Sequence, residues 1–492
     1  MHPPPYGQSL SLLTDLYELT MAFGYWKDGL AERDAVFHVA FRRHPFGGGF
    51  TLACGLAAAV DWLRDFSFEQ DDLDYLAGLE SADGSALFSG EFLEWLGAAE
   101  FACDIDAAPE GTLVFPHEPL LRVEGPLWQA QMVESALLNL VNFQTLIATK
   151  AMRTALAAGD DPILEFGLRR AQGVDGALAA SRASWIGGCA ATSNVLAGKL
   201  YGIPVRGTHA HSWVMAFDEE LESFRAYARA LPANCIFLVD TYDSIEGVRN
   251  AIVAARELRA RGHKTVGIRL DSGDLVELSR RARAMLDEAG FPEARIVASG
   301  DLDEHVILDL KQRGARIDVW GVGTRLVTGY DDPALGGVYK LAAIRDPDGE
   351  WQDRLKLSDS TEKSSIPGIQ AVRRYHRDGR ALGDLIHDRR REPARLDESV
   401  LLAGGAWPTG LEAAESGDLL RPVFRRGKLV NELPSAEAAR MHAQEQRRRF
   451  GLTTEALEVD PCYPVALAAE TADEKERLVR VIREADSGRA RR

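Results

Sequence analysis

The feature that most constrains the fold is an alternation of short apolar runs with helical stretches between residues 160 and 330. The runs are rich in β-branched residues and recur at intervals of roughly thirty residues, as βαβ units do. The six runs are Ile163–Phe166, Ile203–Arg206, Cys235–Asp240, Thr265–Leu270, Ala294–Ser299 and Ile317–Trp320. Helical periodicity separates them, as in Ser244–Arg261, Leu275–Ala289 and Glu304–Gln312. The pattern predicts a parallel sheet, and six units favour a closed barrel over an open sheet.

Each apolar run is followed by polar residues or glycines. These endings are Glu165–Arg170, Thr208–His211, Asp240–Thr241, Arg269–Asp274, Ser299–Asp301 and Gly321–Thr324. One such ending indicates a turn. Six of them at the carboxyl ends of consecutive strands predict a functional face, because α/β barrels place their chemistry there.

The stretch Gly207–Trp213 concentrates reactive side chains at one of these endings. It holds two imidazoles, His209 and His211, next to the hydroxyls of Thr208 and Ser212. Histidine exchanges protons near neutral pH and also acts as a nucleophile. Taken alone, the stretch is equally compatible with a polar turn around a buried histidine. Its place among six polar strand ends favours a functional role.

The residues before this region predict a mixed α+β domain. We expect an amphipathic helix at Ser9–Gly29 and strands at Ala35–Phe41 and Phe50–Ala53 that form a hairpin. The tip of that hairpin, residues 42–49, is cationic and glycine-rich, and is either a solvated turn or an anion clamp. A long helix is expected from Pro126 to about Ala158.

The sequence therefore predicts three domains. They are an N-terminal α+β domain at 1–158, an α/β barrel at 159–368 and a C-terminal region with a short sheet and helix at 369–492. Toward the end of the chain, one more strand is expected at Val338–Ile344, sheet in the smaller domain at Val372–Tyr375 and Leu420–Phe424, and a charged helix at Pro434–Arg449.

Composition narrows the class of protein. The net charge of −17 over 492 residues argues against non-specific binding to nucleic acid or to an anionic membrane, so an anionic ligand needs local arginines. Five scattered cysteines, without a Cys-x-x-Cys pair, indicate a reducing compartment rather than disulfides or a zinc site. The apolar runs are shorter than a membrane span, and Met1–Pro5 does not resemble the start of a signal peptide. We expect a cytoplasmic protein.

The strand endings favour a phosphorylated sugar as ligand. Backbone N–H groups at Ser299–Gly300 and Gly321–Thr324, together with the starts of the following helices, suit phosphate. The turn Arg269–Asp274 adds a guanidinium for an aromatic acid or phosphate and two carboxylates for ribose hydroxyls or Mg²⁺. Neither a Gly-x-Gly-x-x-Gly turn after a strand nor a Gly-x-x-x-x-Gly-Lys-Ser/Thr loop occurs, which argues against a redox dinucleotide.

Several motifs together resemble the nicotinate phosphoribosyltransferase family, a type II phosphoribosyltransferase family. They are Thr14–Met21, Glu165–Gly173, Gly207–Ser212, Arg269–Asp274, Gly321–Thr324 and Gly336–Leu341. The resemblance runs in order from Thr14 to about Gly368 and is weak beyond that point.

The resemblance implies an irregular α/β barrel with an α+β N-terminal domain, working as a homodimer. It implies the conversion of nicotinate, phosphoribosyl pyrophosphate, ATP and water to nicotinate mononucleotide, ADP, phosphate and pyrophosphate, with Mg²⁺, in NAD salvage. By the same resemblance, His211 is the histidine that ATP phosphorylates transiently, and His209 fills a variable, supporting position. Tyr17 resembles the tyrosine that stacks on the pyridine ring from the partner subunit, although a packing role is an equal alternative.

The expected site residues fall into three groups. The catalytic residues are His211, Asp271 and Arg269, with Asp271 also a candidate Mg²⁺ ligand. Those for nicotinate are Tyr17, Phe166, Arg169, Ser193 and Thr208. Those for phosphoribosyl pyrophosphate are Arg269, Asp271, Ser272, Gly273, Ser299, Gly300, Gly321, Gly323 and Thr324.

Two other functions remain open at this point. A sister phosphoribosyltransferase acting on nicotinamide or quinolinate would keep the fold and change the pocket for the base. Ser193 bears on that choice, because the similar nicotinamide enzymes carry an aspartate at the matching position. The alternative is that Ser193 is a plain loop serine without a role in choosing the base. A non-catalytic dimer that binds a phosphoribosyl compound is the second possibility, and the retained His211, Asp271 and Arg269 argue against it.

Overall fold

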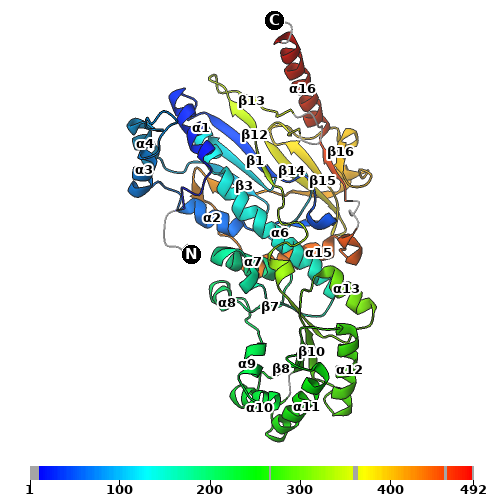
Figure 1. The fold of residues 1–492 in the computed structure, drawn as a ribbon. Coiled ribbons are helices and arrows are strands. Elements are labelled where there is room, and N and C mark those ends of the chain that lie inside the picture. Colours follow the sequence, from blue (N-terminus) through cyan, green and yellow to red (C-terminus); the bar gives the residue numbers. More distant parts are fainter. Residues whose placement is uncertain (1–9, 265–266, 358–363, 459–462, 490–492) are drawn as a thin grey trace. The chain divides into compact units, whose positions relative to one another are not determined.

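The structure is a computed structural model that describes residues 10–264, 267–357, 364–458 and 463–489. The chain divides into two compact units (Figure 1). One comprises residues 1–146 and 334–492, and the other comprises residues 147–333. This division differs from the three predicted domains, whose boundaries stay a prediction. Within the described residues, no helix has both the length and the apolarity to cross a membrane.

The unit of residues 147–333 contains a six-stranded sheet in which every pair of neighbours is parallel. Its strands are β6 (Ile163–Glu165), β7 (Ala191–Thr192), β8 (Ile236–Leu238), β9 (Gly267–Leu270), β10 (Arg295–Ala298) and β11 (Val319–Val322). The spatial order is β7-β6-β11-β10-β9-β8. Because β11 pairs with β6, the last strand of the unit lies beside the first, and the strands follow one another in chain order around a ring.

The ring has one seam, between β7 and β8. Next to β7, Val205 forms a parallel bridge with Thr192, so residues 203–206 continue the sheet beyond that strand. Thr192 donates its N–H to the carbonyl of Pro204, and Arg206 donates to the carbonyl of Thr192, each across 3.0 Å. In the part of the chain that the structure describes, β8 pairs with β9 alone. The predicted α/β barrel is therefore irregular, with strand pairing interrupted at this seam.

The connections of this unit are helical, as the alternation predicts. The helices that begin and end within it are α7 (Gly173–Gly187), α8 (Val195–Tyr201), α9 (His211–Met215), α10 (Glu220–Ala230), α11 (Ser244–Ala260), α12 (Leu275–Glu288), α13 (Glu304–Gln312) and α14 (Thr324–Val327). Each of the three helices predicted in this unit starts after an aspartate that accepts backbone N–H groups, namely Asp243, Asp274 and Asp303. In α12 the buried residues recur at helical spacing from Leu275 to Leu286, which turns one face toward the sheet.

The other unit is built on a seven-stranded antiparallel sheet in the order β13-β12-β1-β5-β3-β18-β19. Its strands are β1 (Asp34–Ala40), β3 (Asp104–Ala107), β5 (Leu121–Pro126), β12 (Val338–Arg345), β13 (Trp351–Asp353), β18 (Arg421–Arg425) and β19 (Lys428–Leu429). Helices α1 (Leu16–Lys27), α2 (Leu56–Arg64), α3 (Gln70–Ala77), α4 (Gly90–Gly97) and α5 (Leu127–Met132) belong to the same unit. Phe37 of β1 stacks on Tyr339 of β12 with ring centroids 4.9 Å apart, which joins strands 300 residues apart in the chain.

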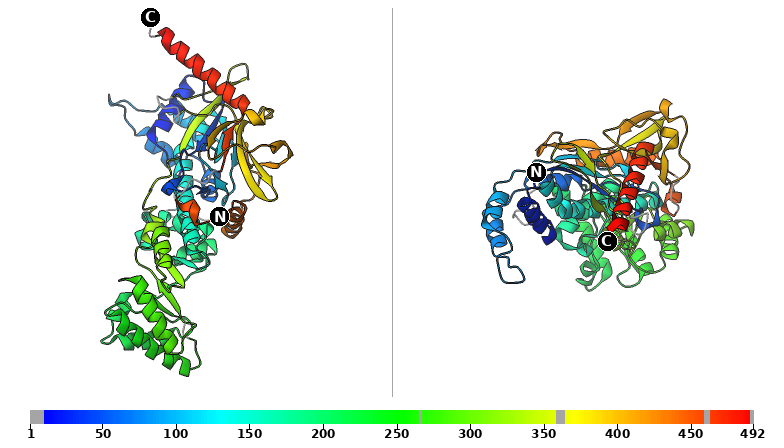
Figure 2. Two further views of the ribbon diagram at one scale, coloured as in Figure 1. Left: turned by 90° about the vertical axis from the view of Figure 1, so that its right-hand side faces the viewer. Right: turned by 90° about the horizontal axis from the view of Figure 1, so that it is seen from above.

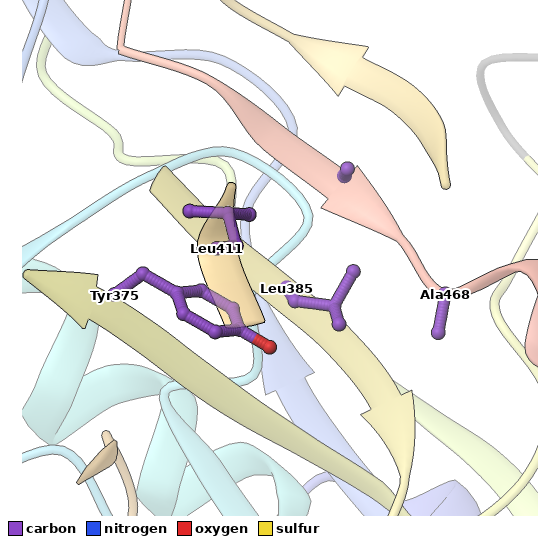
Figure 3. Packing of buried hydrophobic residues seen from close by; sticks show 5 residues of the cluster. Tyr375, Leu385, Leu411 and Ala468 are labelled. Carbon is purple, nitrogen blue, oxygen red and sulfur yellow. The ribbon is translucent and has the colours of Figure 1, made fainter. Parts of the chain in front are cut away.

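A second sheet in this unit has the order β16-β20-β15-β14-β17. Its strands are β14 (Gln370–Arg377), β15 (Arg380–Asp388), β16 (Val400–Ala403), β17 (Glu415–Asp418) and β20 (Val465–Leu467). Figure 3 shows the apolar cluster on it, formed by Tyr375, Leu385, Leu411, Ala466 and Ala468. Helix α15 (Ala436–Arg449) confirms the predicted charged helix, and α16 (Ala469–Arg489) extends from this sheet (Figure 2).

Several sequence predictions for strand pairing were wrong. Phe50–Ala53 does not form a hairpin with β1: β2 (Thr51–Leu52) pairs with β4 (Leu113–Val114), whereas β1 pairs with β5 and β12. The predicted strand Leu420–Phe424 corresponds to β18, which joins β3 instead of the smaller sheet. Local alternation reports that a segment is extended, but its partner depends on contacts distant in the chain.

Some element boundaries also differ. The expected long helix is interrupted at Val133, between α5 and α6 (Glu134–Ala158), and Pro126 ends β5 instead of opening the helix. The last barrel strand is Val319–Val322, two residues later than predicted, and β7 was missed because it is only two residues long. Helix α1 starts at Leu16, whereas Ser9, Thr265 and Val266 of the predicted elements lie outside the described residues.

Candidate functional site

His211 is the first residue of α9, and residues 207–210 separate it from the segment 203–206 that continues the sheet. Its side chain is 41% exposed, so the imidazole is open to a ligand. Nδ1 lies 3.1 Å from the hydroxyl of Thr241, which follows β8, and Nε2 lies 3.9 Å from Oδ2 of Asp271, which follows β9. One nitrogen is thus held by a hydroxyl while the other faces a carboxylate.

Arg269 links the ends of neighbouring strands. Its Nε donates to the hydroxyl of Ser299 across 2.7 Å, and one terminal nitrogen donates to Oδ1 of Asp271 across 2.6 Å. The other terminal nitrogen donates to the hydroxyl of Thr208 across 3.1 Å. The guanidinium carbon also lies 5.5 Å from the centroid of the Phe166 ring. A guanidinium with this many partners is held in one orientation.

Asp271 is held in its ionised form. Burial raises the pKa of its carboxyl, but the hydroxyl of Ser299 and the charge of Arg269 outweigh burial and lower the pKa below its ordinary value. Ser299 donates to the same oxygen that Arg269 contacts. The second oxygen, Oδ2, is the one that faces His211.

Asp240 is a site residue that the sequence reasoning did not single out. Its Oδ2 accepts the backbone N–H of Asp271 across 2.9 Å and the hydroxyl of Ser272 across 2.6 Å. Its Oδ1 is buried and has no hydrogen-bond partner among the described residues. The polar pair Asp240–Thr241 at the end of the third predicted strand was the signal that could have identified both residues.

Two glycines permit the close approach of these groups. Gly300 has φ of +100°, and a Cβ there would lie 2.3 Å from the carbonyl oxygen of Asp271. A Cβ on Gly321 would lie 2.9 Å from the ring of Phe166 and 3.2 Å from Cβ of Ser299. Larger residues at either position would push strand ends apart.

The ends of β6 and β7 are tied together by a buried carboxylate. Glu165 accepts hydrogen bonds from the N–H of Gly167, from the hydroxyl of Ser181 across 2.9 Å and from the hydroxyl of Thr192 across 2.5 Å. The N–H of Ser193 donates to the carbonyl of Glu165 across 2.9 Å. Phe166 and Ser193, both expected to contact nicotinate, therefore extend from one rigid pair of strand ends.

The remaining predicted residues are placed as follows. Arg169 lies on an exposed 3₁₀ turn, Leu168–Arg170. Gly273 lies in the turn between β9 and α12, and Gly323 and Thr324 lie where β11 passes into α14. Tyr17 lies on α1 in the other unit and is 44% exposed, so its expected place on the pyridine ring stays a prediction.

Two of the helix starts near the site are capped by aspartate side chains, and the expected contribution of helix starts to phosphate binding stays a prediction. Asp274 accepts the N–H groups of Val276 and Glu277, and Asp303 accepts that of Val306, so α12 and α13 are capped by their own side chains. Helix α14 has only four residues.

Family models of nicotinate phosphoribosyltransferase match three parts of the chain. The N-terminal domain model matches residues 12–142, the family model matches residues 162–347 and the C-terminal domain model matches residues 370–475. Each matched range lies within one of the three domains predicted from the sequence.

Individual relatives extend the match over nearly the whole chain. The nicotinate phosphoribosyltransferase of Bacillus subtilis is 43% identical over 472 residues, covering 94% of both chains. The crystal structure of human nicotinic acid phosphoribosyltransferase superimposes with a TM-score of 0.79 at 34% identity, covering 94% of this chain and 99% of the human one. A nicotinate-nucleotide pyrophosphorylase from Pyrococcus furiosus shares the fold with a TM-score of 0.70 at 21% identity, covering 91% and 98%. On these matches, the chain belongs to the nicotinate phosphoribosyltransferase family.

Proposed function

We propose that this chain joins nicotinate to the phosphoribosyl group of phosphoribosyl pyrophosphate, driven by ATP through a phosphohistidine at His211. The products are nicotinate mononucleotide, pyrophosphate, ADP and phosphate, and the reaction is the entry of nicotinate into NAD salvage. Family membership supports the reaction. The assignment of His211 as the phosphorylated residue is supported by one observation. Its exposed imidazole has Nδ1 beside the hydroxyl of Thr241 and Nε2 beside the carboxylate of Asp271.

The phosphoryl step follows from this geometry. When Nδ1–H donates to Thr241, the lone pair of Nε2 is available as a nucleophile. Nε2 attacks the γ-phosphorus of ATP, the new N–P bond forms, and the bond to the ADP oxygen breaks. Asp271 then faces the positively charged phosphoimidazole ring and stabilises it. Water later takes the phosphoryl group and releases phosphate.

The glycosyl step needs positioning and charge stabilisation more than covalent chemistry. As pyrophosphate leaves C1 of the ribose, positive charge develops on the sugar and the ring nitrogen of nicotinate attacks it. Arg269 offsets the negative charge of the phosphate groups, and the ionised Asp271 lies where ribose hydroxyls can donate to it. Ser272, Gly273, Ser299, Gly300, Gly321, Gly323 and Thr324 provide the surrounding polar turns for phosphoribosyl pyrophosphate.

The carboxylates of the site fit Mg²⁺. Asp240 has one buried oxygen without a hydrogen-bond partner among the described residues, and Asp271, which follows the next strand, contributes Oδ2. Among the described residues no group of three or more His, Cys, Asp or Glu forms a complete metal cage. This arrangement suits Mg²⁺, which binds through one or two carboxylates together with water and substrate phosphates. When bound there, the ion would shield the charge of the departing pyrophosphate.

The nicotinate pocket is proposed to consist of Phe166, Arg169, Ser193 and Thr208, with Tyr17 of the partner subunit closing it in a homodimer. The phenyl ring of Phe166 offers a face for the pyridine ring, and Arg169 offers a cation for its carboxylate. A cytoplasmic location is proposed from the cysteines. Cys54, Cys103, Cys189 and Cys235 are buried cysteines, which a reducing compartment keeps as thiols.

The test is a product assay with purified protein, Mg²⁺, phosphoribosyl pyrophosphate and each of three bases. We expect nicotinate mononucleotide from nicotinate, accompanied by ADP when ATP is present, and far lower turnover of nicotinamide or quinolinate. Equal use of nicotinamide would assign the chain to a sister activity. Binding of phosphoribosyl pyrophosphate without any product would support a non-catalytic role.

A further inference from the structure

The open seam of the barrel is spanned by a side chain. Strand β8 pairs with β9 along one edge, so the backbone N–H of Leu238 points toward the seam on the other. That N–H donates to Nε2 of His209 across 3.2 Å. The imidazole nitrogen thus takes the place that the carbonyl of a neighbouring strand occupies elsewhere in the sheet.

The ring of His209 is buried against aromatic side chains of α10. The side chain is only 7% exposed. Its ring meets that of Tyr227, on α10, edge to face at 4.8 Å between centroids and 64° between planes, and Phe224 of the same helix lies 6.1 Å away. Tyr227 also contacts Trp213 of α9 at 5.8 Å. Packing therefore holds the imidazole in the orientation that its hydrogen bond requires.

His209 is electrically neutral near pH 7, as an acceptor of a backbone N–H must be. Burial, assisted by the charges of Arg269 and His211, lowers the pKa of its imidazole to about 4, although the hydrogen bond that the ring donates to the carbonyl of Ala210 acts in the opposite direction. The neutral ring accepts at Nε2 and carries its proton at Nδ1, 3.4 Å from that carbonyl.

The loop that carries His209 contacts the ends of two neighbouring strands, β9 and β8. Thr208 accepts from Arg269 of β9, His209 accepts from Leu238 of β8, and His211 contacts Thr241 just beyond β8. Leu238 and Thr241 are three residues apart, and the two histidines that contact them, His209 and His211, are two residues apart. The contact of His209 therefore sets where α9 begins relative to the end of β8.

We propose that His209 is a positioning residue that closes the barrel seam and holds His211 in place for phosphorylation. The proposal rests on the proposed phosphohistidine chemistry, whereas the seam contact itself does not. Phosphoryl transfer requires Nε2 of His211 to lie within a few tenths of an ångström of its productive place, because misplaced reacting atoms lose most of the advantage of binding.

The experiment compares His209→Gln, whose Oε1 reaches the position of Nε2, with His209→Asn and His209→Leu. The shorter amide of asparagine does not reach Leu238, and leucine has no acceptor. An exposed histidine of the same unit, His263, provides the matched control His263→Leu. We expect the Asn and Leu variants to phosphorylate His211 from labelled ATP at least about tenfold more slowly at saturating ATP. The Gln variant and the control should stay within about threefold of wild type.

Amide hydrogen exchange provides a readout that is independent of activity. The amide of Leu238 should exchange faster in His209→Asn and His209→Leu and remain protected in His209→Gln. Wild-type phosphorylation in both Asn and Leu variants, or loss in Gln with Leu238 still protected, would overturn the positioning role. If the His209→Leu variant does not fold, the comparison of His209→Gln with His209→Asn tests the positioning role. Wild-type protein that forms nicotinate mononucleotide without a phosphohistidine would refute the proposed ATP mechanism, and exchange at Leu238 would still test the seam contact.

Discussion

Arg269 donates to Oδ1 of Asp271 across 2.6 Å, two residues further along the chain. The guanidinium lies on β9 and the carboxylate follows its last residue, so both side chains reach the functional face from a single strand end. This leaves Oδ2 of Asp271 toward His211 and the second terminal nitrogen of Arg269 toward Thr208. This pair of side chains is the centre of the candidate site.

Arg269→Lys should lower kcat/KM for nicotinate mononucleotide formation by at least about a hundredfold. Lysine keeps the charge but cannot contact Ser299, Asp271 and Thr208 together, and hydrogen bonds to charged groups contribute about 1.5–3 kcal/mol each. Arg249→Lys, at an exposed ion pair on α11, should retain wild-type kinetics. Steady-state kinetics of both variants measure the difference. A small effect of Arg269→Lys would show that charge alone is sufficient.

His211→Ala should abolish ATP hydrolysis and most turnover while the protein stays folded, because the side chain is 41% exposed and contributes little packing. Acid-labile phosphate from labelled ATP should disappear from this variant. Circular dichroism provides the control for folding. Finding the phosphate on His209 of the wild type would contradict the assignment, since Nε2 of that residue is engaged by Leu238.

Tyr17 should act in the site of the other subunit. Tyr17→Ala and His211→Ala should each be inactive as separate homodimers, and mixing them should restore part of the activity through heterodimers with one intact site. The mixture is assayed for nicotinate mononucleotide after subunit exchange has been verified. If exchange occurs without recovery, the site is complete within one chain.

Ser193→Asp should reduce the preference for nicotinate over nicotinamide. The N–H of Ser193 is fixed by the carbonyl of Glu165, so an aspartate at this position would present a carboxylate at the end of β7. Two like charges enclosed together cost several kcal/mol, and about 1.4 kcal/mol already changes a preference tenfold. The ratio of kcat/KM for the two bases is the measurement. An unchanged ratio would leave Ser193 as an ordinary loop residue.

The unfolding free energy should depend on pH through His209. Its pKa is about 4 in the folded chain and has an ordinary value of 6.5, so between these values the unfolded chain binds the extra proton. This contribution to stability is complete above the ordinary value and is lost as the pH falls toward about 4. Between about pH 7 and pH 4.5, wild type should therefore lose about 1–3 kcal/mol more stability than His209→Gln. Denaturant titrations measure this loss. His38 and His44, whose pKa values are also lowered by burial, remain in both proteins and cancel in the comparison.

The sequence alone determined three of the longer helices and most of the strands of the barrel unit because their periodicity is local. The predicted ranges Ser244–Arg261, Leu275–Ala289 and Glu304–Gln312 agree with α11, α12 and α13 to within a residue at each end. It also placed Thr208, Arg269, Asp271 and Ser299 at strand ends, where the structure joins them by hydrogen bonds. In a parallel sheet, polar residues that follow successive strands must meet at one face.

Only the tertiary structure decided which strands pair with one another. Strand β12 pairs with β1, β18 pairs with β3, and among the described residues β8 pairs with β9 alone. It also gave Asp240 its buried oxygen and His209 its contact with Leu238, neither of which a local pattern reveals. Periodicity reports which face of a segment is apolar, whereas pairing depends on backbone groups and side chains that are tens or hundreds of residues apart in the chain.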